Sequence, residues 1–234
     1  MAPRMRRRFA SALLSVLAIS LSPPGTPGFN QVAAMTSGEA RVPLEPGRTT
    51  GTQPVGLFYR VEVSAVGSRR VDTRTWLFLP GQRVSRVHPF GGVGAFDPSR
   101  CNPDTCGTYQ IGAGQLTVRW DGGLVHQWAF AASASGISLD GALYRPARVM
   151  TAAALIGQWV SPGDGGSNVY TFDGNGRFRF GTGQGGLTGT YRAQGFALSL
   201  TFSDGDVRRR TLFAASAGEP VGMISVEGEV YARK

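Results

Sequence analysis

One stretch of the chain occurs twice, with the same order of blocks and closely similar residues. Each copy begins with Gly-Thr-Tyr, continues through an apolar run and a Phe-Ala-Ala-Ser block, and ends in an alternating segment that contains tyrosine. The matching blocks are 107–109 with 189–191, 116–120 with 198–202, 130–133 with 213–216, and 137–144 with 224–231. The offset is 82 residues at the first block, 83 at the third and 87 at the last. This pattern indicates an internal duplication of a whole β unit whose strands match and whose turns differ in length.

The residue pattern inside each copy is typical of half-buried strands joined by tight turns. Leu116, Val118 and Trp120 alternate with polar residues, so they share one face of a strand. Glycine-containing turns then separate the expected strands of the second copy, which favours a meander of antiparallel neighbours. These expected strands are 157–160, 168–173, 177–181, 188–193, 196–202, 207–213, 223–227 and 229–232. In the first copy, strands are expected over 57–63, 73–79 and from 83 to 87.

One spacing differs between the copies and predicts a local irregularity. Val207 and Phe213 are six residues apart and therefore share a face of their strand. Val125 and Phe130 are five apart, which places them on opposite faces of a regular strand. If the two copies match at these residues, a β-bulge over 126–128 would restore the register.

The second copy resembles the small lipocalin-like barrels of bacterial secreted proteins. The resemblance rests on Gly157 and Trp159, on the aromatic hairpin 170–178 and on the Gly-Thr-Tyr at 189–191. It covers 157–232 directly and 56–146 through the duplication, although Gly-Leu-Phe at 56–58 replaces the Gly-x-Trp opening. What the resemblance implies is an eight-stranded barrel and a lipophilic ligand, with no specific activity.

These patterns predict an all-β protein of two tandem antiparallel meander units, each a small lipocalin-like barrel or a strongly curled sheet. The first unit spans 55–148 and the second spans 149–234. A short helix over 152–155, capped by Thr151 and ended by Gly157, connects them. Eight short strands enclose an interior that side chains can just fill, so a filled core is favoured over an apolar cavity.

The first 34 residues have the pattern of a secretory signal peptide. An apolar run over 9–21 follows an arginine cluster, and small residues at 32–34 offer a cleavage site. The apolar run is too short for an ordinary transmembrane helix, so no membrane span is expected in the mature chain. Residues 35–54 are rich in Gly, Pro, Thr and Ser and predict a flexible linker. A periplasmic or secreted location follows.

The charge of the chain does not favour nucleic acid as a partner. The signal segment contains four of the 24 basic residues and none of the 15 acidic ones, which leaves a mature net charge of +5. The basic residues are scattered, and the only run is Arg208, Arg209 and Arg210. On a strand these three alternate between faces and cannot form a continuous phosphate-binding stripe, so solvated charge is the favoured interpretation.

Cys101 and Cys106 predict a disulfide that closes one loop. An exported chain meets an oxidising compartment, where such a bond persists. A loop of about six residues contributes roughly 2 kcal/mol by chain entropy. Four intervening residues do not match redox motifs, and the further ligands that zinc requires are missing, so neither a metal nor a cofactor is expected.

No catalytic motif is evident. The sequence lacks a Gly-x-Ser-x-Gly elbow, a His-Glu-x-x-His pair and a Walker loop. The Gly-x-Gly-x-x-Gly match at 181–186 leads into a strand rather than a helix, which excludes the dinucleotide interpretation. The mature chain has two histidines, of which His126 lies on a strand and His88 lies in a loop. No catalytic residue is assigned.

The loop over 88–106 is the feature that the two copies do not share. The first copy carries about a dozen extra residues there, closed by the cysteine pair. A stapled loop with aromatic and basic residues is a common way to present a binding surface, while the alternative is a loop that covers one end of the barrel. The candidate binding residues are Arg86, His88, Phe90, Phe96 and Arg100.

The favoured function is that of an exported, non-enzymatic binding or envelope-associated protein. Its partner would be a small apolar ligand or an envelope component. Two alternatives stay open: a hydrolase-type enzyme that pairs His88 with Asp97 or Asp104, and an interaction or inhibitor module that acts through the loop.

Overall fold

The computed structural model describes residues 41–234 apart from 64–70, 87–93, 163–167, 182–184 and 219. The expected signal peptide and the first part of the expected linker lie outside the described residues. Within the described part, no helix is long and apolar enough to cross a membrane. The expected all-β class is confirmed, and strands account for nearly all of the regular structure.

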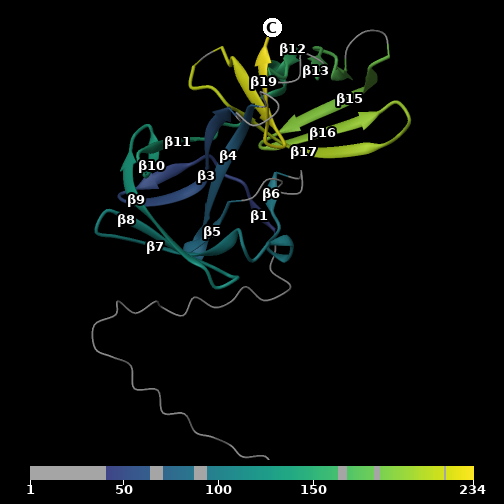
Figure 1. The fold of residues 1–234 in the computed structure, drawn as a ribbon. Coiled ribbons are helices and arrows are strands. Elements are labelled where there is room, and N and C mark those ends of the chain that lie inside the picture. Colours follow the sequence, from purple (N-terminus) through teal and green to yellow (C-terminus); the bar gives the residue numbers. More distant parts are fainter. Residues whose placement is uncertain (1–40, 64–70, 87–93, 163–167, 182–184, 219) are drawn as a thin grey trace, which may run out of the picture. The chain divides into compact units, whose positions relative to one another are not determined.

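The first half of the chain forms a closed antiparallel ring of strands (Figure 1). Consecutive strands pair with one another, and the last strand returns to pair with the first through Arg145 opposite Tyr59 and Pro146 opposite Phe58. The strands of this first ring are β3 (Gln53–Val63), β4 (Val71–Leu79), β5 (Arg83–Ser85), β7 (Cys106–Gly112), β8 (Gln115–Trp120), β9 (Val125–Ser133), β10 (Gly136–Leu139) and β11 (Ala142–Pro146).

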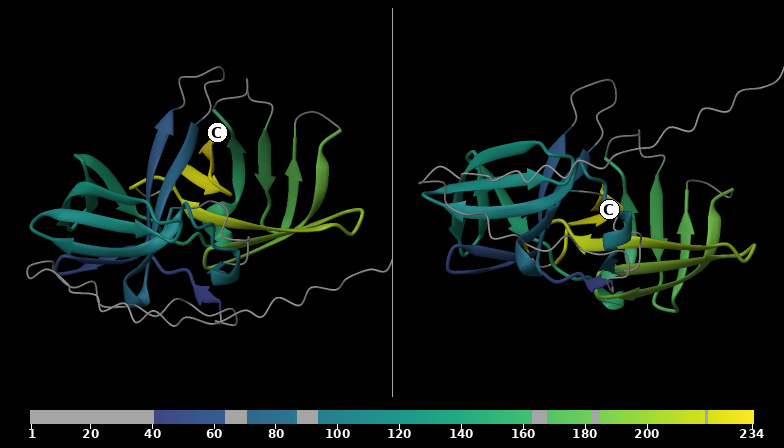
Figure 2. Two further views of the ribbon diagram at one scale, coloured as in Figure 1. Left: turned by 60° about the horizontal axis from the view of Figure 1, so that its bottom comes forward. Right: turned by 90° about the horizontal axis from the view of Figure 1, so that it is seen from below.

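The second half closes in the same way, through Trp159 opposite Arg233 and Val160 opposite Ala232. The strands of this second ring are β12 (Gly157–Val160), β13 (Val169–Phe172), β14 (Arg177–Phe180), β15 (Leu187–Gln194), β16 (Ala197–Phe202), β17 (Val207–Ala214), β18 (Met223–Val226) and β19 (Glu229–Arg233). The ends of these strands differ from the predicted ends by at most one residue, because alternation and turn glycines indicate where each strand begins and ends. Figure 2 shows the strands of the first half in purple to teal and those of the second half in green to yellow.

Short elements lie outside the two rings. The helix α1 (Ala152–Leu155) begins at Thr151, whose side chain accepts a hydrogen bond from the Ala154 backbone N–H at 3.1 Å. Strand β1 (Val42–Pro43) pairs with β6 (Ala95–Phe96), and β2 (Arg48–Thr50) pairs with β3. Short 3-10 turns cover Pro80–Gln82 and Pro98–Arg100.

The expectation of a flexible linker over 35–54 differs from the structure in its described part. Residues 42–43 and 48–50 are in strands, and the side chain of Leu44 is buried. The Leu44 N–H donates to the Gly94 carbonyl at 2.9 Å. The composition of this segment is typical of a flexible linker. Composition alone does not show whether a neighbouring strand is available for the segment to pair with.

Side chains fill the interior of each ring. The first ring encloses an aromatic-rich cluster, and the second encloses a separate cluster around Trp159. The Trp159 indole N–H donates to the Leu155 carbonyl at 2.7 Å and thereby ties α1 to this core. The residues of the first interior are Phe58, Trp76, Phe78, Val84, Tyr109, Leu116, Val118, Trp120, Phe130, Ile137 and Leu139. The expectation of filled interiors therefore holds for the middle of each ring.

A third apolar cluster contains residues from both rings. Tyr59 of β3 and Phe213 of β17 pack with their ring centroids 5.2 Å apart. Strand β19 also touches β4, where Glu229 stands opposite Asp72, and the Thr73 and Ser225 hydroxyls lie 3.1 Å apart. The described residues accordingly belong to one compact unit. The core members of this shared cluster are Leu44, Leu57, Tyr59, Leu77, Leu79, Phe96, Cys106, Ala147, Phe196, Phe213 and Ala215.

The predicted bulge over 126–128 is wrong. Strands β8 and β9 pair without interruption from Arg119 opposite Val125 to Gln115 opposite Ala129. Phe130 points into the first ring, whereas Phe213 lies on the outer face of its strand and packs in the shared cluster. The register therefore matches Phe130 with position 212 rather than with Phe213, and no extra residue is needed.

Candidate functional site

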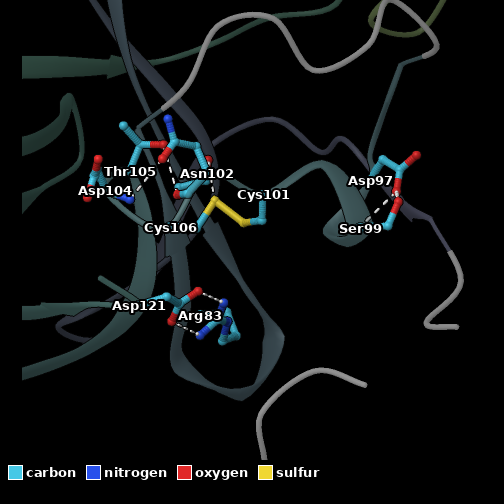
Figure 3. The surroundings of a disulfide bond; sticks show 10 residues. Arg83, Asp97, Ser99, Cys101, Asn102, Asp104, Thr105, Cys106 and Asp121 are labelled. Atoms are coloured by element: carbon cyan, nitrogen blue, oxygen red, sulfur yellow. Dashed lines mark hydrogen bonds and ion pairs between the residues drawn. A yellow bond between two sulfur atoms is a disulfide. The ribbon is translucent and has the colours of Figure 1, made fainter. Parts of the chain in front are cut away.

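The predicted disulfide is confirmed. Cys101 and Cys106 are bonded, with their Cα atoms 5.8 Å apart, and Figure 3 shows the bond beside the turn that it closes. The Asn102 carbonyl accepts hydrogen bonds from the Thr105 and Cys106 N–H groups, and its side chain accepts one from Asp104 N–H at 3.0 Å. The bond therefore staples a turn that already has its own hydrogen bonds.

The described part of the 88–106 loop is packed against the protein. Phe96 is only 6% exposed and belongs to the shared cluster, so its ring offers no surface to a partner. Asp97 accepts hydrogen bonds from the Ser99 N–H and hydroxyl and lies 3.5 Å from Arg41 (Figure 3). Burial and these hydrogen bonds favour the covering role for this segment. Arg100 is exposed.

Two of the sequence-predicted binding residues, His88 and Phe90, lie outside the described residues. The hydrolase interpretation rests on His88 and stays a prediction. The described residues contain no group of three or more His, Cys, Asp or Glu side chains that could hold a metal ion.

Arg86 lies among three tryptophans at one end of the first ring. Its guanidinium carbon is 5.1 Å from the centroid of Trp76 and 5.8 Å from those of Trp120 and Trp128. Trp76 and Trp128 meet edge to face at 5.1 Å, which fixes the two rings at an angle to each other. Arg86 is exposed, and Trp128 is half-buried. This cluster, here called the Trp–Arg end, gathers three of the four tryptophans of the chain.

His126 completes the Trp–Arg end. The Trp120 indole N–H donates to His126 Nδ1 at 2.8 Å, so the neutral imidazole carries its proton on Nε2. The ring stands on the same side of its strand as Trp128, with the two centroids 5.6 Å apart. The imidazole is exposed, and it serves to orient an indole as well as to present a donor to solvent.

The corresponding end of the second ring is hollow. A pocket of about 270 Å³ lies beside the turns at 203–206 and 227–228. Aromatic and aliphatic side chains form its walls, and two arginines and two glutamates add charge. The lining residues are Tyr170, Phe180, Leu200, Phe202, Arg208, Arg210, Val226, Glu227, Glu229 and Tyr231.

Each charged group of this pocket has a partner in the pocket or beside it. Arg208 lies 4.7 Å from the Phe202 ring centroid and 2.8 Å from Asp206. Arg210 lies 3.8 Å from Glu227, and the Tyr231 hydroxyl donates to Glu229 at 2.8 Å. The pocket therefore presents polar groups without a large excess of either charge.

Burial shifts the pKa of two groups in the pocket. It raises the pKa of Tyr170 to about 12, since the phenolate would lose its hydration. Burial also raises the pKa of the Glu227 carboxyl, against the opposing effects of its hydrogen bond from Thr211 N–H and of Arg210. Both shifts have the same main cause, because burial penalises the charged form of each group.

The two ring ends have the same strand register but carry different types of residue at equivalent positions. His126 stands opposite Val118 as Arg208 stands opposite Leu200, and Trp128 stands opposite Leu116 as Arg210 stands opposite Leu198. The first ring therefore has aromatic rings on β9 where the second has arginines on β17. Alternation along β17 could have revealed the second-ring site from the sequence. Arg208 and Arg210 lie on one face of this strand, and the outward-facing Val207 and Arg209 lie on the other.

No protein-family model, curated protein or solved structure matches the sequence.

Proposed function

We propose that this chain is an exported, non-enzymatic binding protein whose second ring holds a small, partly apolar ligand in the pocket at its end. The pocket itself carries the proposal, since it is a concavity above a filled core with aromatic walls and a few polar groups. This combination is typical of small-molecule sites. A volume of about 270 Å³ fits a molecule of about one ring rather than a long acyl chain.

The pairing within each ring supports an origin by duplication of a lipocalin-like unit. Gly107 stands opposite Trp120 as Gly189 stands opposite Phe202, and Tyr109 stands opposite Val118 as Tyr191 stands opposite Leu200. The offset of these pairs is 82 residues throughout. A constant offset at hydrogen-bonded positions is a stronger argument than similarity of sequence blocks, because register shifts turn side chains to the other face.

An exported location fits the disulfide and the signal-like pattern of residues 1–34. A bond between Cys101 and Cys106 persists where thiols are oxidised, as in the periplasm or outside the cell. The proposed place of action is therefore the periplasm or the extracellular medium.

Ligand-observed NMR with 4-methylphenol tests the pocket, since this neutral probe combines one ring with one hydroxyl. Val226→Phe adds a ring inside the pocket, whereas Thr201→Phe adds the same ring at an exposed position of β16, between the pocket residues Leu200 and Phe202. Saturation transfer to the probe is expected for the wild type and for T201F, and its loss is expected for V226F. Thermal unfolding checks that both variants are folded.

Native mass spectrometry of the protein purified from an exporting cell is the second arm of this test. A bound small molecule that V226F loses and T201F keeps would support the pocket. Equal 4-methylphenol binding by V226F and the wild type, or no binding by either, would contradict the proposal.

A further inference from the structure

We infer that the Trp–Arg end of the first ring is a second binding site, which takes small ligands that carry a carboxylate or a phosphate on a flat apolar group. This site is separate from the pocket of the second ring and does not depend on it. Its elements are one guanidinium, one imidazole N–H and the indole surfaces between them.

The Arg86 guanidinium is held in place but has no anionic partner within the described residues. Its position is fixed by three indole rings at 5.1 to 5.8 Å. A guanidinium that stacks on aromatic faces still has its N–H groups at the edge, and their fork geometry matches a carboxylate or phosphate in a bidentate manner. The exposed Arg86 therefore combines a preset orientation with guanidinium donors that no residue in the described ranges engages.

Three acidic side chains of the first ring are engaged elsewhere. Asp121 pairs with Arg83 at 2.6 and 2.8 Å (Figure 3). Glu62 accepts a hydrogen bond from Arg74 at 2.8 Å and also pairs with Arg60. Asp140 accepts from the Ala129 N–H at 2.7 Å. These three carboxylates are satisfied without Arg86.

The neighbouring side chains suit a ligand with a flat ring. His126 presents Nε2–H to solvent because Nδ1 already accepts from Trp120. The half-buried Trp128 lies near both groups, with its ring centroid 5.6 Å from that of His126 and 5.8 Å from the Arg86 guanidinium carbon. A ring carried by the anion can stack on this exposed indole surface while its charged group faces the two donors.

The second ring provides the contrast. Arg208 also lies over an aromatic ring, but Asp206 accepts from it at 2.8 Å. Arg210 likewise has Glu227 nearby. An anion would have to compete with these carboxylates, so Arg208 is the matched control for Arg86.

Intrinsic fluorescence reports on the proposed site, because three of the four tryptophans line it. The full chain is titrated with benzoate and with phenyl phosphate, and with benzyl alcohol and benzylamine as neutral and cationic probes of the same size. A saturable change is expected with one or both anions at concentrations at least about tenfold lower than with the other two probes. The more effective anion distinguishes a carboxylate ligand from a phosphate ligand.

Substitutions locate the response. Arg86→Gln is expected to weaken binding of the anion by about tenfold to a hundredfold, and Arg86→Lys, which keeps the charge but loses the planar fork, is expected to weaken it less. Arg208→Gln is expected to leave it unchanged. Near-equal affinity of R86Q and the wild type, or binding of benzylamine as tight as that of benzoate, would overturn the inference.

The two proposals fail independently. Equal 4-methylphenol binding by V226F and the wild type, or no binding by either, together with an anion response that R86Q weakens, would overturn the pocket and leave the Trp–Arg end standing. An absent response to both benzoate and phenyl phosphate, with 4-methylphenol binding that V226F loses, would overturn the Trp–Arg end and leave the pocket standing.

Discussion

Asp140 and Glu227 occupy the same place in the two rings, each at the start of a tight turn. Both have positive φ, 48° and 53° respectively, and both carboxylates accept a backbone hydrogen bond from the neighbouring strand. Asp140 accepts from Ala129 N–H at 2.7 Å, and Glu227 accepts from Thr211 N–H at 3.3 Å. Both acids therefore have a structural role at their turns, and in the second ring Glu227 also lines the pocket.

Replacing Glu227 with Gln is expected to change how stability depends on pH. Burial raises the pKa of this carboxyl in the folded state, so its contribution to stability is complete below the ordinary glutamate pKa and falls as pH rises through the raised value. Glutamine keeps an acceptor for Thr211 N–H and cannot ionise. The free energy of unfolding of E227Q minus that of the wild type, both from urea denaturation, is therefore expected to increase as pH rises from about 4 to 7.

Asp140→Asn, at the matching turn, controls for the effect of an amide on the hydrogen bond itself. A wild type that gains stability over E227Q as pH rises would contradict the assignment. The pair with Arg210 is half-exposed and adds at most about 1 kcal/mol, so its loss does not mask the trend.

At the scale of elements, strand positions followed from the sequence and their surroundings did not. Alternation and glycine turns located every strand of the second ring, because both are local properties. The surroundings of Phe213 and Phe96 could not be predicted in this way, since alternation assigns a residue to a face but does not say what covers that face. Phe213 lies on an outer face that the first ring covers, and Phe96 lies in a loop that packs inward.

The same limit applies to the site residues. Arg86 was a candidate from its place beside the loop, yet its aromatic partners come from β4, β8 and β9 and meet only when the ring closes. Arg208 and Arg210 were interpreted as solvated charge. Both side chains line the pocket, because they lie on the same face of β17. The sequence indicated this only through the alternation of faces along that strand.

Removing the disulfide is expected to have a small effect. The loop that it closes is short, so Cys101→Ala with Cys106→Ala should lower the free energy of unfolding by about 2 kcal/mol in urea denaturation. The turn keeps its own hydrogen bonds to Asn102, and the pairing of Cys106 with Ser85 continues β5 and β7. Reduction of the wild type is the control and should give the same loss. Unfolding of the whole chain on reduction would contradict this account.

At the scale of the whole molecule, two closed rings, each with an apolar cluster in its middle, share a third core. The contact between Tyr59 and Phe213 and the pairing of β4 with β19 join them. Within this common architecture the two ring ends differ in chemistry. One has a guanidinium among indoles with no carboxylate partner in the described part of the chain, and the other has a pocket in which Arg210 and Glu227 are paired. The central claim is that one scaffold carries two binding sites for different classes of small molecule.

Amide chemical-shift mapping on the ¹⁵N-labelled protein tests this claim most directly, with 4-methylphenol and benzoate added separately. We predict that 4-methylphenol shifts amides around Leu200, Val226 and Tyr231, and that benzoate shifts those of Arg86 and Trp128. Shifts of the same amides by both probes, or no shift at either ring end, would contradict the account.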